Sequence, residues 1–351
     1  MTPTLTHPFA QRLMNEKDDS NPSPSDNDDK PVSVPRRARL RRWLPRLMFV
    51  MLTVGAVVAG VFWWQEHSLA VAETALGDGE LEYALYLAEN FLENRPSHVR
   101  ALSLRARALV ALRSNPDEAL RIFDEVGAAS AEEVHAWAQA CLMKQRWSQA
   151  LPLLVRSVQM TPTDANAIYE LAICRTHLGQ LEEALETAQR MVELPDNEAR
   201  GQMLVGTIHG DMGNVEGAAE AYASVLQYEP EGENLQVPPH SFFLQYGRAL
   251  LQSGKPAASI GPLKISVSKT PTADAFVELG EAASQIGEIK NAELAWKEAL
   301  KYSPLDRQAR ESLANSALQA LAAEDALKWL GPLEEVPGMR EIGRAACRER
   351  V

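Results

Sequence analysis

The chain has 351 residues, of which 46% are hydrophobic and 23% charged, and this composition excludes collagen-like, disulfide-rich and wholly disordered proteins. Its three cysteines provide no disulfide framework. The formal net charge is −12 at pH 7, so the phosphate backbone of nucleic acid is a disfavoured partner.

Residues 1–46 differ in composition from everything that follows. Asp, Ser, Asn and Pro dominate up to about Pro35, and a segment with so few apolar residues cannot offset the entropy of chain ordering by burial. A cluster of arginines then runs from Arg36 to Arg46. We expect residues 1–46 to be a disordered cytoplasmic segment, acidic at first and basic at its end.

Residues 47–64 form an apolar stretch without a charged side chain, LMFVMLTVGAVVAGVFWW. As a helix it would be about 27 Å long, close to the hydrocarbon thickness of a bilayer. The arginines before it predict a cytoplasmic N-terminus, with the rest of the chain across the membrane. A signal peptide cleaved near Ala70 and Ala72 and a reversed orientation are the alternatives. Gly55 and Ala59 could bring two such helices together as a weak homodimer.

The remainder of the chain repeats with a period close to 34 residues. Recurring alanines mark the period at Ala84, Ala119, Ala150, Ala184, Ala218, Ala258, Ala292 and Ala326. Glycine precedes several of them, at Gly79, Gly179, Gly213, Gly254 and Gly287, and proline follows several, at Pro96, Pro162, Pro195, Pro230, Pro271 and Pro304. Because glycine permits a tight turn and proline cannot continue a helix, each unit is predicted to be helix, turn, helix and stop.

The pattern resembles the tetratricopeptide repeat, which places a large residue, a leucine and a small residue on the first helix of each unit. The best match begins with Phe276, Leu279 and Gly280 and continues with Gly287, Ala292, Trp296 and Pro304. The resemblance implies an all-α fold, an α-solenoid in which the first helices line a concave face that binds peptides or helices of partner proteins. About eight repeats are expected within residues 65–340, at 65–98, 100–130, 131–164, 165–198, 199–232, 240–272, 273–306 and 307–340.

The predicted groove is apolar and aromatic with few charges, which suits an amphipathic helix or an apolar extended segment. Its residues are His135, Gln139, Met143, Tyr169, Ile173, His177, Met203, Thr207, Leu244 and Arg248. Ile173 and Leu244 could equally belong to the core between repeats. Tetratricopeptide domains that hold chaperone C-terminal carboxylates use Lys, Asn and Arg at these places, and this set lacks that clamp.

No catalytic constellation is present in the sequence. The histidines have no metal-ligand spacing, the glycines form no phosphate-binding loop, and there is no nucleophile elbow. Cys141 and Cys174 are expected to be small buried residues. We therefore predict a protein that is not an enzyme and has no cofactor, metal or nucleic-acid partner.

The last residues, 341–351, break the repeat and resemble the translation of a sequencing-adapter read-through, so we expect a non-native tail and a natural protein that continues. The overall expectation is a single-pass protein of a bacterial inner membrane, with periplasmic repeats that act as a scaffold in envelope assembly or secretion. A holdase-like chaperone near the translocon and the regulatory part of a longer enzyme are the alternatives.

Overall fold

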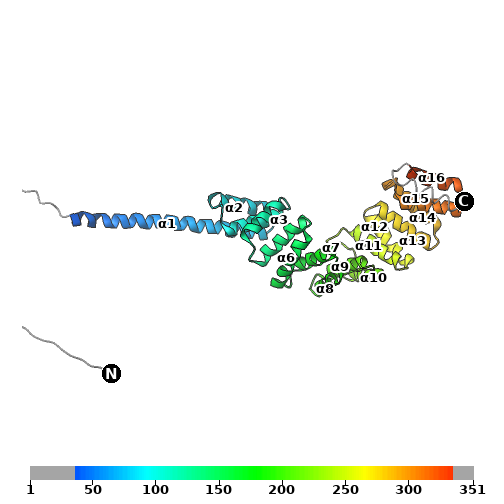
Figure 1. Cartoon of the computed structure of the whole chain (residues 1–351), viewed down its shortest axis with the longest axis horizontal. Helices are drawn as coiled ribbons and strands as arrows, with labels where there is room; N and C mark the ends of the chain where they lie inside the picture. The colour runs from blue at the N-terminus through cyan, green and yellow to red at the C-terminus, as the bar shows by residue number, and fades with distance from the viewer. Residues whose placement is uncertain (1–35, 335–351) are drawn as a thin grey trace, which may run out of the picture. The chain divides into compact units, whose positions relative to one another are not determined.

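The computed structural model describes residues 36–334. The segment before residue 36 and the predicted non-native tail at 341–351 lie outside the described residues. Within 36–334 all sixteen elements are α-helices, so the all-α expectation is confirmed for the described part of the chain (Figure 1). The structure divides into two units, residues 1–64 and residues 65–351.

Helix α1, Arg36–Gly77, contains all the described residues of the first unit and continues into the second. It begins at Arg36, so the prediction of disorder is wrong for residues 36–46. Arginine is a good helix former, and the cluster adjoins an apolar stretch that is itself helical. The predicted membrane span begins at Leu47, and the side chains of that residue and of 61–63 lie outside those described. Over the side chains that are described, no helix is long and apolar enough to cross a membrane.

The second unit is a row of helical hairpins, which we number 1 to 8 in chain order. Hairpin 1 pairs the end of α1 with α2, Leu81–Asn94. Hairpins 2 to 4 are α3 Val99–Ala111 with α4 Pro116–Val126, α5 Ala131–Met143 with α6 Trp147–Met160, and α7 Ala165–His177 with α8 Leu181–Val192. Hairpins 5 to 8 are α9 Glu198–Asp211 with α10 Val215–Tyr228, α11 Pro239–Gln252 with α12 Pro256–Lys269, α13 Ala273–Gln285 with α14 Ile289–Tyr302, and α15 Arg307–Gln319 with α16 Ala323–Glu334.

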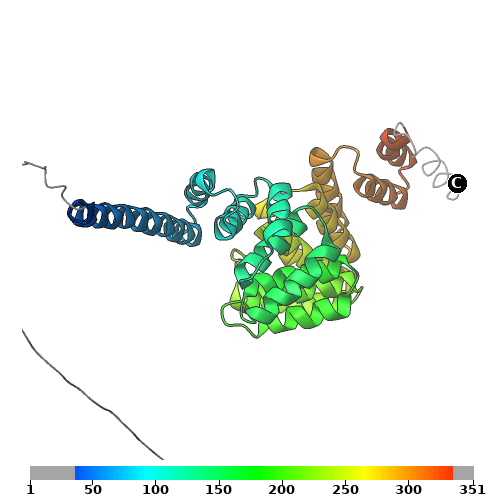
Figure 2. The same ribbon diagram turned by 60° about the vertical axis from the view of Figure 1, so that its left-hand side comes forward.

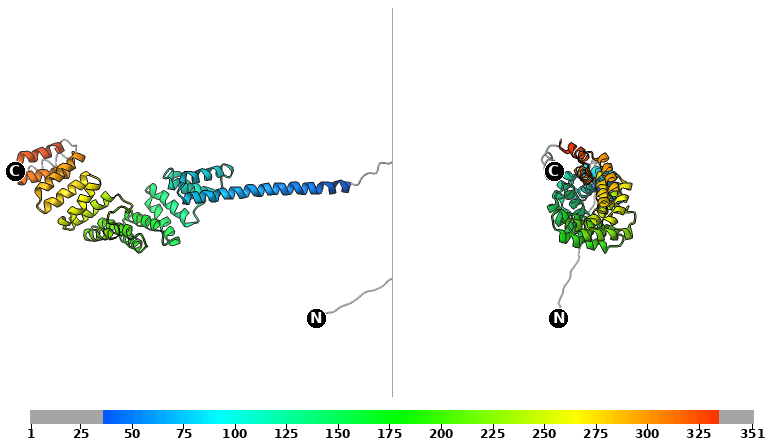
Figure 3. Two further views of the ribbon diagram at one scale, coloured as in Figure 1. Left: turned by 180° about the vertical axis from the view of Figure 1, so that it is seen from behind. Right: turned by 90° about the vertical axis from the view of Figure 1, so that its right-hand side faces the viewer.

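Consecutive hairpins lie side by side along the row, in the order of the sequence (Figures 1 and 2). Seen along the row, they curve around a common axis (Figure 3). Neighbouring first helices contact one another at α3 and α5, α7 and α9, and α11 and α13, whereas second helices make no contact as extensive within the described residues. Since the inner layer of a curved stack is the closer-packed one, the first helices line the inside. We call the surface of α3, α5, α7, α9, α11, α13 and α15 that faces this axis the inner face.

Glycine on a first helix admits a large side chain from the second helix of the same hairpin. A Cβ added at Gly206 would lie 2.6 Å from Cε1 of Tyr222, and one at Gly247 would lie 2.5 Å from Cγ of Leu263. At Gly280 it would meet the Trp296 ring, 2.5 Å from Cδ1. These side chains therefore seat directly on the backbone of the facing helix, which is the close approach that the small residue of each repeat permits.

The turn within each hairpin requires a residue in the left-handed region. Five of these turns use the predicted glycines, and Gly179 and Gly287 have φ of 74° and 82°. Where the repeat lacks a glycine, Arg113, Gln145 and Leu321 adopt φ of 52°, 56° and 59° instead. The packing of the hairpin thus outweighs the cost of placing a residue other than glycine in the left-handed region, which is roughly 1 kcal/mol for each such residue.

Candidate functional site

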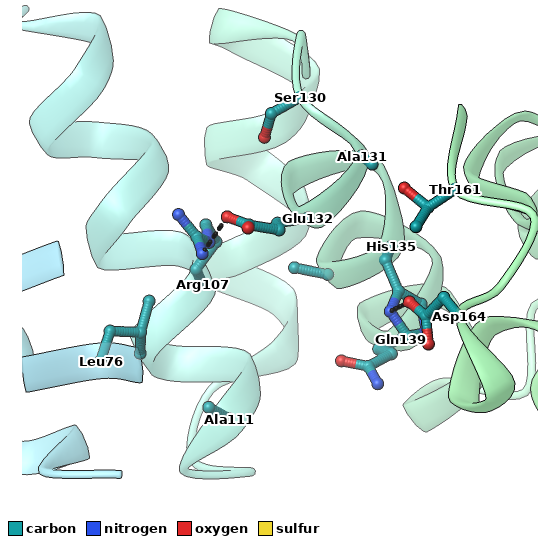
Figure 4. Close-up of a pocket in the computed structure, with 11 residues that line it drawn as sticks. Leu76, Arg107, Ala111, Ser130, Ala131, Glu132, His135, Gln139, Thr161 and Asp164 are labelled. Atoms are coloured by element: carbon teal, nitrogen blue, oxygen red, sulfur yellow. Dashed lines mark hydrogen bonds and ion pairs between the residues drawn. The ribbon is translucent and has the colours of Figure 1, made fainter. Parts of the chain in front are cut away.

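A pocket opens on the inner face across hairpins 1 to 4, with a volume of about 500 Å³. It is walled by Leu76 at the end of α1, Arg107 and Ala111 of α3, the first turns of α5, and Thr161 and Asp164 from the loop before α7 (Figure 4). Ser130 caps α5, since its hydroxyl accepts the backbone N–H of Glu133. Asp164 caps α7 in the same manner. Helix caps therefore hold Ser130 and Asp164 in the wall of the pocket.

His135 and Gln139 project from α5 toward a shared carboxylate on α7. His135 Nε2 lies 2.8 Å from Glu170 Oε2, and the Gln139 amide donates to Glu170 Oε1 at 2.8 Å. Asp164 Oδ2 lies 3.6 Å from the other ring nitrogen of His135. Burial lowers the pKa of His135, but the bond to Glu170 and the charges of Glu170 and Asp164 outweigh it and hold that pKa above its ordinary value. This cluster joins hairpins 3 and 4.

Other charged pairs also bridge first helices along the inner face. Arg107 donates to Glu132 at 2.7 Å within the pocket. Arg248 on α11 donates to Glu278 on α13 at 2.6 Å. Charged partners therefore lie beside three of the predicted groove residues, His135, Gln139 and Arg248. The sequence pattern could not reveal them because the glutamates come from the next repeat.

The structure separates the remaining predicted groove residues into core and surface. Met203 is 7% exposed and belongs to the core. Met143, Tyr169, Ile173 and Leu244 are half-buried and pack against core clusters. The Thr207 hydroxyl donates to the Met203 carbonyl at 3.0 Å and lies 3.3 Å from the hydroxyl of Tyr222.

His177 lies apart from the pocket, at the end of α7. It is exposed, and its ring stacks on Trp147 with centroids 3.9 Å apart. It therefore covers the start of α6 rather than facing the His135 cluster.

Sequence reasoning missed a second polar cluster, at the joint of hairpins 4 and 5. The guanidinium of Arg200 on α9 donates to the side-chain oxygens of Asn197 at 2.9 Å and Asn166 at 3.1 Å. Its Cζ lies 5.8 Å from the centre of the Tyr169 ring. Asn166 and Arg200 are one repeat apart in the sequence, so aligning the repeats by that period would have placed them at equivalent positions.

The two described cysteines, Cys141 and Cys174, are buried and form no disulfide with each other. Burial raises the pKa of the Cys174 thiol to about 11, and it also raises that of Cys141. Cys174 donates to the Trp147 carbonyl at 3.3 Å. No group of three His, Cys, Asp or Glu side chains in residues 36–334 is arranged to hold a metal ion.

Comparison with known proteins identifies the repeat in two segments. Residues 142–208 match one model of the tetratricopeptide repeat, and residues 277–330 match another. Hsp70-Hsp90 organizing protein 1 of Glycine max is 26% identical over 105 residues, which are 30% of this chain and 18% of that protein. Hsp70-Hsp90 organizing protein of Triticum aestivum is 28% identical over 92 residues, 26% of this chain and 16% of that protein. The chain thus spans less than a fifth of the length of these relatives.

Solved structures share the fold at low identity. The C-terminal part of a TPR repeat-containing protein from Cytophaga hutchinsonii superposes with a TM-score of 0.54 at 13% identity, over 70% of this chain and 99% of that one. The Pseudomonas aeruginosa protein pilF has a TM-score of 0.50 at 16% identity, over 62% of this chain and 97% of its own. The family matches, together with the hairpin geometry, identify residues 142–208 and 277–330 as tetratricopeptide repeats within an α-solenoid.

Proposed function

We propose that the protein is a scaffold, without a catalytic role, whose inner face binds segments of partner proteins. The observation that carries this proposal is the inner face itself. It presents half-buried aromatic and polar side chains over successive first helices, beside a pocket of about 500 Å³. A concave surface of this kind is the extended binding surface that repeat proteins use.

The polar character of the inner face favours selective binding over a holdase-like role. His135, Gln139 and Arg248 are engaged by glutamates from neighbouring repeats. A promiscuous chaperone surface requires adaptable apolar groups, whereas a face of fixed donors and acceptors accepts only a partner that matches them. We therefore favour one or a few defined partners.

Site-specific photocrosslinking in cells tests this proposal. A photoreactive residue replaces Thr207, a predicted groove residue on the first helix α9, or, as the matched control, Gln189, which is exposed on the second helix α8. We expect a few discrete crosslinked products from position 207 and none of them from position 189. Identical products from both positions would contradict an inner-face site, and a broad smear of unrelated proteins from position 207 would favour the holdase-like alternative.

A membrane tether is the second part of the proposal. The described residues 48–60 of α1 are all exposed, and Phe49, Met51, Leu52 and Val57 are each at least 66% exposed. They point in different directions around the helix, and a helix that is apolar all round suits lipid better than a groove on a protein. The arginine cluster before the stretch supports a cytoplasmic N-terminus, with the repeats in the periplasm of a bacterial cell and a role in envelope assembly or secretion.

Topology mapping tests the tether. A reporter fused after Pro304 and protease treatment of spheroplasts containing the unfused chain should both place the repeats outside the cytoplasm, in the membrane fraction. Recovery of the chain in the soluble fraction after carbonate washing would refute the tether. Pairing of two copies through Gly55 and Ala59 stays a prediction, which crosslinking in the membrane would test.

A further inference from the structure

The second helix of hairpin 1, α2, presents two tyrosines to solvent. Tyr83 is 47% exposed and Tyr86 is 61% exposed. Within the described residues, neither hydroxyl has a hydrogen-bond partner and neither ring lies against another aromatic ring or a cation. Because they are three residues apart, the two side chains are neighbours on the helix surface. They form an exposed aromatic surface on the layer of second helices rather than on the inner face.

Tyrosine at these two positions is particular to hairpin 1. Each second helix carries a small residue that is at most 2% exposed, such as Ala84 in α2, and the tyrosines stand one residue before it and two residues after it. The equivalent residues are charged in two other hairpins, Glu183 and Glu186 in α8 and Asp325 and Lys328 in α16. No other second helix has an aromatic residue at either position. The packing of the repeat therefore does not require them.

Carboxylates surround this aromatic surface. Glu82 stands four residues before Tyr86 and Glu89 three residues after it, so both are its neighbours on the helix surface. Glu93 lies one turn beyond Glu89, and α2 contains no lysine or arginine. Glu89 is paired with Arg105 at 3.1 Å. Glu82 and Glu93 are exposed and make no ion pair within the described residues, so two negative charges remain beside the tyrosines.

Exposed tyrosine rings beside unpaired carboxylates favour a positively charged ligand. The face of an aromatic ring attracts an ammonium or guanidinium group, and a guanidinium also stacks on it. The charges of Glu82 and Glu93 add to the attraction for a cation and repel anionic lipid headgroups. Tyrosine is also a common anchor of protein interfaces, because its large ring has few rotatable bonds. A basic protein segment therefore matches both the rings and the charges.

We propose that the outer surface of α2, formed by Tyr83, Tyr86, Glu82 and Glu93, binds a basic segment of a partner protein, with an arginine or lysine over the Tyr86 ring. This surface is separate from the inner face and its pocket, and the inference goes beyond the binding role proposed for them. A chain that uses both surfaces holds two partner segments at once.

Fluorine-19 NMR of the full chain in micelles of an uncharged detergent tests this surface. The seven tyrosines are replaced by 3-fluorotyrosine, and single phenylalanine variants assign the signals. The probe is the peptide acetyl-Arg-Leu-Arg-Leu-Arg-amide, and its analogue with citrulline in place of arginine keeps the shape without the charge. Tyr228 on α10 is the internal reference, because it is 53% exposed and precedes Glu229, so it reports nonspecific attraction of the peptide to an acidic chain.

The arginine peptide should cause saturable shifts at Tyr83 and Tyr86 and a much smaller change at Tyr228. The citrulline peptide should cause none of these shifts, since it offers no cation to the rings. In Tyr86→Ser, the affinity measured at Tyr83 should fall about threefold or more, as expected for loss of an exposed contact between a cation and a ring.

Variants that remove charge separate the local carboxylates from the overall charge of the chain. Glu82→Gln combined with Glu93→Gln should lower the affinity about threefold or more, because each exposed ion pair contributes modestly. The matched control, Glu182→Gln combined with Glu186→Gln, removes the same charge from exposed positions of α8 and should leave the affinity unchanged. Circular dichroism and an unchanged signal of Tyr222, which is buried, verify that both variants are folded.

Equal shifts at Tyr228, an equal response to the citrulline peptide, or no saturable response would each overturn this inference. An equal loss of affinity in the variant at Glu182 and Glu186 would also overturn it, since only net charge would then attract the peptide. A lipid ligand is tested by transfer of the chain from phosphatidylcholine to phosphatidylglycerol nanodiscs without peptide. Shifts at Tyr83 and Tyr86 in that transfer would assign the surface to lipid headgroups instead of a protein, whereas unchanged signals there support a protein partner.

Discussion

Replacing Gly280 by alanine should weaken hairpin 7, even though alanine is the better helix former. An added Cβ would fall 2.5 Å from Cδ1 and 2.9 Å from Cε2 of Trp296. Trp296 is 4% exposed and packed in the core with Val277 and Leu313, so its ring cannot move aside without displacing its neighbours. Helices α13 and α14 would have to separate.

The size of the effect follows from two opposed terms. Overpacking of a filled core costs about 1–3 kcal/mol, and the overlap with several ring atoms indicates the upper end, about 3 kcal/mol. Replacing glycine inside a helix by alanine contributes about 1 kcal/mol of stability. The net loss in Gly280→Ala is therefore about 2 kcal/mol.

Gly210→Ala is the matched control because the same substitution is made inside a helix, at an exposed position of α9 that no proline follows. Nothing lies within 4 Å of a Cβ added at Gly210. Only the propensity term remains, so the free energy of unfolding of this variant should rise by up to about 1 kcal/mol. Gly280→Ala should therefore be less stable than the natural protein and Gly210→Ala more stable, with a difference between the two variants of up to about 3 kcal/mol.

Urea unfolding of the full chain in detergent, followed by circular dichroism, compares the two variants. Because repeat arrays can unfold in parts, amide hydrogen exchange in α13 and α14 gives the local free energy of opening. Exchange there should accelerate in Gly280→Ala and stay constant in Gly210→Ala. Equal or greater stability of Gly280→Ala would refute the packing role that we assign to the small residue of each repeat.

Three other predictions concern protonation, the thiols and the turns. The pKa of His135 is raised above 6.5, so the stability that its charged form contributes is complete below that pH and is lost as the pH rises through the raised value. The joint of hairpins 3 and 4 should therefore loosen toward alkaline pH. Hydrogen exchange in α5 and α7 at pH 6 and pH 8 should show this loosening in the natural protein but not in His135→Gln. With a pKa of about 11, the Cys174 thiol is deprotonated in only about one molecule in a thousand at pH 8. A thiol reagent should therefore modify Cys174 only after the chain is denatured. Rapid reaction of Cys174 in the folded chain would disprove its burial. The Leu321 side chain is 93% exposed, and its backbone has a φ of 59°. Leu321→Gly should therefore relieve left-handed backbone strain without loss of packing and stabilise hairpin 8 by up to about 1 kcal/mol. A lower urea midpoint for this variant than for the natural protein would show that the Leu321 side chain makes a stabilising contact.

The sequence alone determined the repeating architecture. The period near 34 residues, the turn glycines and the helix-ending prolines act within one unit, so local chain geometry is sufficient to predict a row of hairpins. The same local pattern placed a small residue on the first helix, Gly280 in the best-matching repeat, and the structure brings the Trp296 ring against it. Even where glycine was absent, at Gln145 and Leu321, the neighbouring packing imposed the same turn.

Only the tertiary structure decided what the inner face presents. Whether Glu170 meets His135, or Asn166 meets Arg200, depends on the rotation of each hairpin relative to the next, which no single repeat encodes. The same rotation placed Met203 in the core rather than on the open face. The period could therefore indicate which residues lie on first helices, but the pairing of polar side chains between repeats was set by the contact between neighbours.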